Sequence, residues 1–223
     1  MDVLECIRTR RSIRKYLTKP VEFDKILVIC EAGHNAPSAG NLQNWRFIIL
    51  TDKEIIQKLP QHCLNQDFIA APVVIIVCSE NEDMEKHYGI RGSRLYAVQN
   101  CAAAIENMLL AAHAIHLGAC WIGAFDEEKI GEICQIPKHA RPQALLTIGY
   151  PAEDPPTKRL RKFEDVVHFN TYNNKIKDIH LETRNYSDEI EKRTKEVQGI
   201  VSRGKKKIND YWNVYVPKGL KKK

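Results

Sequence analysis

The sequence predicts a fold that mixes helices and strands, and three observations indicate it. Short apolar runs, typical of buried strands, alternate with segments whose apolar residues recur every three or four positions, as on a helix face. The longest helical segment, at about 93–117, is apolar on most faces, which predicts burial on nearly all sides and a partner subunit over part of it. The chain has 223 residues, 43% hydrophobic and 28% charged, enough for a core of its own.

The individual elements follow from the same patterns. Helices are predicted at 2–10, 20–32, 52–58, 93–117 and 127–134, and strands at 45–50, 73–78, 120–125 and 144–150. The run at 45–50 is almost continuously apolar and is therefore expected to be a central strand. Gly118 is expected to end the long helix, and Asp126 to cap the one that follows. The composition of 166–169 fits an added strand.

The composition divides the chain at about residue 175. We expect a core domain, residues 1–175, and a charged C-terminal extension, residues 176–223. The extension has helical spacing at 188–201, followed by a lysine run at 205–207 and aromatic residues at 211–215. Although the net charge is +6, a solvated basic tail explains it more simply than nucleic-acid binding, so nucleic acid is not an expected partner.

Segment composition predicts a cytoplasmic protein. No apolar run approaches the length of a membrane span, and the first ten residues lack the apolar stretch of a signal peptide. The seven cysteines are scattered and form no C-x-x-C pair, so we expect neither a disulfide framework nor an iron–sulfur or zinc site. His113 and His116 have metal-binding spacing but no accompanying carboxylate motif, and no metal is expected.

Two stretches carry chemistry. Residues 8–14 contain four arginines and Ser12, and guanidinium groups bind phosphate in bidentate fashion. The stretch APSAGNLQNW, at 36–45, keeps an irregular backbone because of Pro37 and Gly40, and its polar side chains can bind the edge of a flat heterocycle. The alternatives are a solvated basic strip and a plain polar connection.

With two later blocks, these stretches resemble the FMN-dependent nitroreductase family. The four blocks occur in order within residues 1–172: RRSIR, PSAGNLQNW, LGACWIGAFDEE with IPKHARPQALLTIGYP, and RLRKFEDVVHF. The resemblance implies an α+β, nitroreductase-like fold, whose central, mostly antiparallel sheet is flanked by helices. It also implies an intertwined homodimer that binds FMN in the interface.

Matching positions imply the cofactor-binding residues. The phosphate, the ribityl chain and the pyrimidine edge are assigned to Arg10, Arg11, Ser12 and Arg14, with Arg14 near the N1–C2 carbonyl. A second phosphate-binding pair is Arg159 and Arg161, and Asn65 matches a polar residue at the pyrimidine edge. The loop from the second subunit contributes Pro37, Ser38, Asn41 and Gln43. The backbone near flavin N5 is that of Ile122 and Gly123.

The resemblance further implies an FMN-dependent NAD(P)H oxidoreductase working by ping-pong hydride transfer through flavin N5. The expected acceptor is a nitroaromatic, a quinone or a similar conjugated compound. No catalytic side chain is assigned, because the flavin carries the hydride. One departure from the family is Asn44, where many relatives have proline, and we expect it to loosen the loop.

Other functions stay open from sequence alone. Proteins that resemble this family include a reductive dehalogenase, a flavin-fragmenting enzyme and azoline-forming dehydrogenases. A flavin-binding redox or sensor protein without useful turnover is a further alternative. The sequence leaves open the physiological acceptor, the choice between NADH, NADPH and another donor, and the role of the C-terminal extension.

Overall fold

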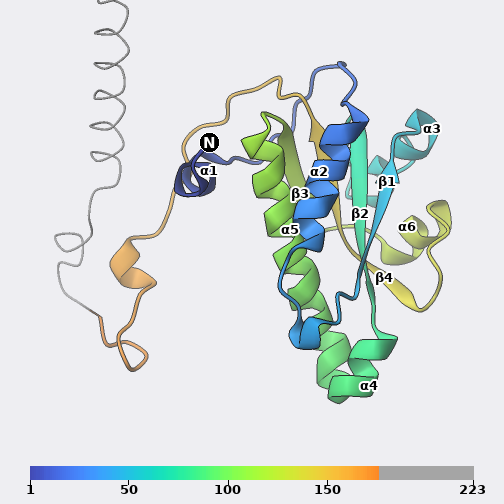
Figure 1. Ribbon diagram of the computed structural model, residues 1–223. Helices are drawn as coiled ribbons and strands as arrows, with labels where there is room; N and C mark the ends of the chain where they lie inside the picture. Colours follow the sequence, from blue (N-terminus) through green and yellow to red (C-terminus); the bar gives the residue numbers. More distant parts are fainter. Residues whose placement is uncertain (176–223) are drawn as a thin grey trace, which may run out of the picture. The chain divides into compact units, whose positions relative to one another are not determined.

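The computed structural model describes residues 1–175, which fall into two units. The first, Met1–Lys158, is built on a four-stranded antiparallel sheet with strand order β1-β2-β4-β3 (Figure 1). Its strands are β1 (Trp45–Leu50), β2 (Val73–Glu80), β3 (Gly118–Ile122) and β4 (Ala140–Gly149). Its helices are α1 (Val3–Thr9), α2 (Phe23–His34), α3 (Lys53–Ile56), α4 (Glu82–Arg91), α5 (Ala97–Ala114) and α6 (Glu127–Ile133). The predicted α+β class with an antiparallel sheet is therefore confirmed.

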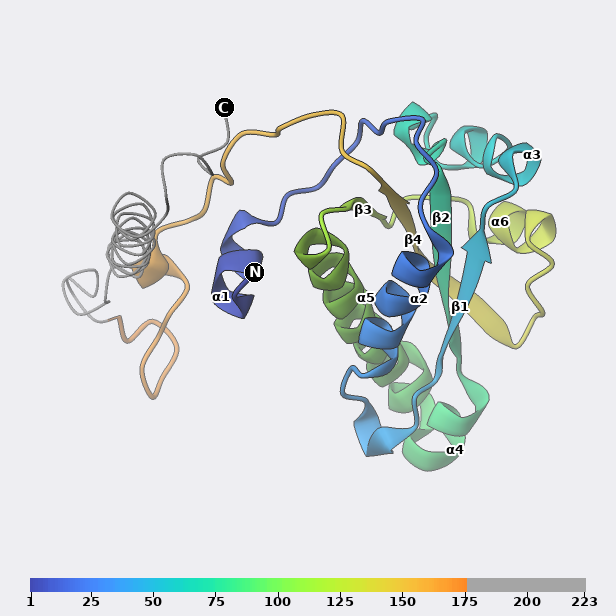
Figure 2. The ribbon, with the colours of Figure 1, turned by 45° about the horizontal axis from the view of Figure 1, so that its top comes forward.

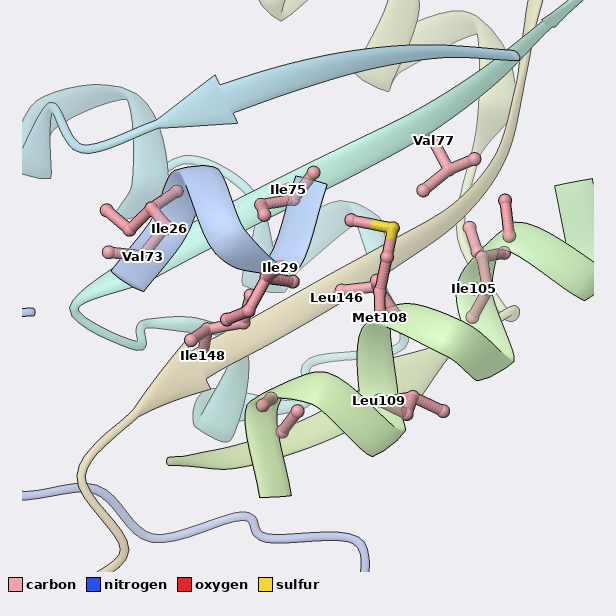
Figure 3. Close-up of a cluster of buried hydrophobic side chains, with 14 of the residues drawn as sticks. Ile26, Ile29, Val73, Ile75, Val77, Ile105, Met108, Leu109, Leu146 and Ile148 are labelled. Carbon is pink, nitrogen blue, oxygen red and sulfur yellow. The ribbon is translucent and has the colours of Figure 1, made fainter. Parts of the chain in front are cut away.

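Helices cover both faces of the sheet, with α2 and α5 on one face and α3 and α6 on the other (Figure 2). Successive side chains of a strand point to opposite faces. Along β2, Val73, Ile75 and Val77 pack with α2 and α5, as the cluster in Figure 3 shows. The alternate residues face the second cluster, so β2 is apolar throughout because both its faces are buried.

The expectation that 45–50 is a central strand is wrong. The bounds of β1 are as predicted, but β1 pairs only with β2 and forms an edge of the sheet within residues 1–175. Its apolar character has another cause. Phe47 and Ile49 pack against the cluster under α2 and α5, whereas Ile48 packs against the opposite one. An edge strand between two helical layers thus resembles a central strand in sequence.

The end of the long helix also differs from the prediction. A short π-helical turn precedes α5, which ends at Ala114, and His116 adopts a left-handed conformation at φ 64°. Gly118 instead begins β3, where a Cβ atom would lie 2.8 Å from the Cβ of Ile13. This glycine allows the N-terminal segment to approach β3 closely.

The predictions for helix capping and helix burial were only partly confirmed. As predicted, Asp126 caps α6, because its carboxylate accepts hydrogen bonds from the backbone N–H groups of Glu128 and Lys129. In contrast, Asp2 makes no side-chain cap for α1. Helix α5 buries one face, and Val98 on another face is 37% exposed. Burial on nearly all sides is therefore not found within one chain.

The second unit is described from Arg159 to residue 175. It holds a short 3₁₀ turn at Phe163–Asp165, and the carboxylate of Asp165 lies 2.8 Å from the Lys175 ammonium. Residues 166–169 form no strand, so that prediction is wrong: no neighbouring strand in the described chain pairs with them. The predicted helix at 188–201 and the aromatic residues at 211–215 lie outside the described residues. The domain boundary at 175 stays a prediction.

No helix among residues 1–175 is long and apolar enough to cross a membrane.

The close approach at Gly118 gives a stability prediction. Gly118→Ala should lower the free energy of unfolding by about 1–3 kcal/mol, because the added Cβ overlaps Ile13. The matched control is Gly131→Ala in α6, where nothing lies within 4 Å of the added atom. There the gain in helix propensity should stabilise by up to about 1 kcal/mol. Urea unfolding measures both, and equal effects would contradict the assignment.

Candidate functional site

The segment with the arginine cluster runs beside the free edge of β3. The backbone N–H of Ile13 donates to the carbonyl of Ala119 at 3.0 Å, and Ser12 pairs with Ala119 in a parallel bridge. Further along, the Tyr16 hydroxyl lies 2.7 Å from Thr147 Oγ1. Side chains alternate along an extended segment, which explains why Ile13 is buried while Arg14 is exposed.

Two of the arginines, Arg10 and Arg11, form contacts with other residues of the chain. Arg10 Nη2 lies 3.3 Å from Glu106 Oε1 on α5, whereas its Nε is buried without a protein partner. The Arg11 guanidinium donates to the carbonyls of Arg8 and Pro156 and lines a cavity of about 230 Å³. The structure therefore does not bring Arg10 and Arg11 together as one exposed phosphate-binding pair.

Arg14, like Arg8, is an exposed cation of the cluster. Its guanidinium carbon lies 5.6 Å from the centre of the Phe68 ring, within the range of a cation–π contact. The carboxylate of Glu153 accepts the backbone N–H groups of Arg14 and Lys15 and so fixes the backbone there. Arg14 also lines a mostly apolar cavity of about 630 Å³ together with Lys53, Asp67 and Phe68, a size suited to a cofactor-sized ligand.

Asn65 and Gly123 lie on neighbouring loops. The Asp126 N–H donates to the His62 carbonyl at 2.8 Å, which joins the turn after β3 to the loop that carries Asn65. Asn65 is exposed in a left-handed conformation (φ 53°), and Gly123 is exposed as well. Ile122 is buried in the core, so only its backbone can contribute to a site.

The 36–44 loop connects α2 to β1 and lies at the same end of the sheet as α4 (Figure 1). Gly40, Asn41 and Gln43 all have positive φ values, of 60°, 56° and 45°. Ser38 Oγ accepts the Gln43 N–H at 3.1 Å, and Gln43 Nε2 donates to the Asn41 carbonyl at 3.1 Å. These bonds make the loop a defined structure, with Pro37 and Asn41 exposed.

The loop and the arginine segment lie at opposite ends of the sheet in one chain. Ser12 pairs with Ala119, which is level with Val73 at the start of β2 through the β3–β4 and β4–β2 registers. The 36–44 loop lies beside Glu80 at the end of β2, where the Glu80 N–H donates to the Asn44 carbonyl. Seven residues of strand separate these levels, or about 23 Å. One chain therefore does not place both sets on one flat ring.

Other predicted and unpredicted positions complete the description. Arg159 and Arg161 are exposed residues of the second unit. Sequence reasoning missed two residues of α5, Glu106 and Asn100, which contact Arg10 and the 36–44 loop. Their signal was present, since each is a polar residue within a largely apolar helix. The expectation that Asn44 loosens the loop stays a prediction: its buried Oδ1 accepts a hydrogen bond from Asn100, whereas its Nδ2 has no partner in the described part of the chain.

The fold and these motifs match known proteins. The nitroreductase family model matches residues 7–67 and 61–150. A Methanothermobacter thermautotrophicus protein, provisionally assigned as an NADH dehydrogenase/NAD(P)H nitroreductase, is 41% identical over 165 residues, covering 72% of this chain and 83% of its own. The FMN reductase [NAD(P)H] of Bacillus subtilis is 31% identical, covering 78% and 75%.

A solved structure shows the same fold. The FMN-dependent nitroreductase of Clostridium difficile superimposes with a TM-score of 0.66 and 27% identity, covering 76% of this chain and 99% of its own. The chain belongs to the nitroreductase family. The family resemblance drawn from the sequence is thereby confirmed.

His113, beside Arg11, gives a pH prediction. Burial, followed by Arg10 and Arg11, lowers the pKa of His113. The unfolded chain then binds this proton at a higher pH than the folded chain, so stability falls as pH drops through and below about 6.5. His113→Gln, which can still bond Thr9, should weaken this pH dependence in urea unfolding between pH 7.5 and 5.5. An unchanged slope would contradict the assignment.

Proposed function

We propose that this protein is an FMN-dependent NAD(P)H oxidoreductase of the nitroreductase type. The observation that carries the proposal is Arg14, an exposed guanidinium at a cofactor-sized cavity, in the segment that holds the family's RRSIR motif. The similar Bacillus subtilis protein is named an FMN reductase [NAD(P)H], and the similar Clostridium difficile structure is an FMN-dependent nitroreductase.

The residues at this end of the sheet fit a flavin nucleotide. Arg14 supplies a cation that favours negative charge on the ligand, and Asn65 supplies an exposed amide that can bind the edge of a heterocycle. The orphaned Nε of Arg10 is a further donor without a protein partner. When bound, FMN supplies the two-electron chemistry that links NAD(P)H to a nitroaromatic, quinone or similar acceptor.

The chain itself contributes position and charge, and we assign no catalytic acid or base. The part-buried hydroxyl of Tyr16 is held by Thr147 and the Ile13 carbonyl. Burial raises its pKa far above the ordinary value. Tyr16 therefore stays protonated and structural, while Arg14 and Asn65 bind and orient the ligand.

The working unit is a homodimer in which the 36–44 loop of one copy meets the arginine segment of the other. The 23 Å separation supports this, because both predicted halves of the site are then used. Exposed apolar side chains on α1 and α2 also support it: Val3, Leu4, Ile7, Phe23, Leu27 and Val28. The protein is assigned to the cytoplasm, in keeping with seven free cysteines.

Removing the exposed cation tests the cofactor assignment. Arg14→Ala should raise the dissociation constant of FMN about tenfold or more, since a charge-assisted bond is lost. Lys129→Ala on α6 removes an exposed cation that is paired with Glu132 instead, and should leave FMN binding unchanged. Quenching of flavin fluorescence measures both. Equal affinities for Arg14→Ala and the unaltered protein would contradict the role of Arg14.

Mixing two defective variants tests the shared site. One variant carries Arg14→Ala and the other carries Asn41→Ala with Gln43→Ala, each binding little FMN at a fixed concentration. In a mixed dimer one site has both halves intact, so an equal mixture should regain about a quarter of the normal FMN content. No recovery, with mixed dimers demonstrated by a tag, would contradict a site made by two chains.

A further inference from the structure

Two buried asparagines join α5 to the 36–44 loop. Asn100 and Asn44 are only 5% and 4% exposed, and Asn100 Nδ2 donates to Asn44 Oδ1 at 2.7 Å. The other end of the same amide, Asn100 Oδ1, accepts the backbone N–H of Ala39 at 3.0 Å. One side chain on a rigid helix therefore holds the loop at two points five residues apart.

Because both asparagines are buried, these hydrogen bonds are costly to break. A buried polar group that loses its partner costs more than an exposed one, because water cannot replace the bond. The Asn44 carbonyl is fixed as well, since it accepts the Glu80 N–H at 2.7 Å. The loop is thus attached to α5 at Ala39, and to both α5 and the end of β2 at Asn44.

The stretch between these two points needs such support. Gly40, Asn41 and Gln43 occupy the left-handed region, which is sparsely populated by residues other than glycine. A Cβ at Gly40 would lie 2.5 Å from the Tyr88 hydroxyl, so α4 closes over the loop there. The conformation that exposes Asn41 is therefore held by α5 and α4 in addition to the hydrogen bonds within the loop.

We propose that Asn44 and Asn100, the amide pair, are positioning residues that preorganise the 36–44 loop for binding the flavin of the partner subunit. The inference rests on the proposed function. The buried amides supply rigidity by hydrogen bonding, because they fix the loop to α5 at Ala39 and at Asn44. Preorganisation lowers the entropy lost on binding, so its loss appears as weaker FMN affinity.

The test uses single and double variants of the full chain. Asn44→Ala, Asn100→Ala and the double variant should each raise the FMN dissociation constant about tenfold. The double variant should be no worse than Asn100→Ala alone, because removing Asn100 already removes the hydrogen bond to Asn44. The matched control is Asn107→Ala, also on α5, which removes a 3.1 Å hydrogen bond to Ala32 on α2 and leaves the loop untouched.

Hydrogen exchange provides a readout without FMN. In the FMN-free protein, the amides of Ala39 and Gln43 should exchange faster in Asn100→Ala than in Asn107→Ala, because only the former releases the loop. The proposal would be overturned if Asn44→Ala, Asn100→Ala and the double variant showed the same FMN affinity and the same amide exchange as Asn107→Ala. If the unaltered protein binds no FMN, the proposed function fails instead, and the exchange difference still tests the amide pair.

Discussion

The packing of α5 against the sheet is the constraint on which the other parts depend. This helix buries eight residues under α2 and the strands, and three of its polar residues each hold a different segment. Asn100 holds the 36–44 loop, Glu106 pairs with Arg10, and Asn107 bonds the end of α2. Because a helix rises about 1.5 Å per residue, these attachment points have fixed spacing. Displacing α5 would move both halves of the candidate site together.

The sheet sets the second distance. β2 is buried on both faces, so its eight residues form a rigid spacer between the arginine segment and the loop. In the proposed dimer, that spacer keeps one chain from closing the site on itself, and the exposed apolar side chains of α2 offer a surface for the second copy. A two-fold arrangement would then use the same two surfaces twice, as isologous dimers do.

The sequence correctly predicted those features of the fold that depend on a local residue pattern. The run at 45–50 became a strand with those bounds, and Asp126 capped its helix, because alternation and capping act within a few residues. What failed depended on distant neighbours. The edge position of β1 depends on which strands pair, and the role of Gly118 depends on the approach of Ile13 from over a hundred residues away.

The candidate site shows the same division. The motif at 8–14 predicted a set of binding residues, but only the fold distinguishes the exposed Arg14 from Arg10, which is paired with Glu106. Similarly, the sequence showed Asn44 only as a replacement for proline, and its hydrogen-bond partner on α5 could not be predicted. A polar residue in an apolar helix indicates that a hydrogen-bonding partner exists, but one sequence does not identify that partner.

Anaerobic mixing of the FMN-loaded protein with NADH or NADPH tests the central claim most directly. The account predicts that one or both nicotinamides bleach the visible flavin absorbance, and that a quinone or nitroaromatic then restores it over repeated cycles. A flavin that binds tightly yet is reduced by neither nicotinamide would contradict an NAD(P)H oxidoreductase and would favour a sensor or a different donor.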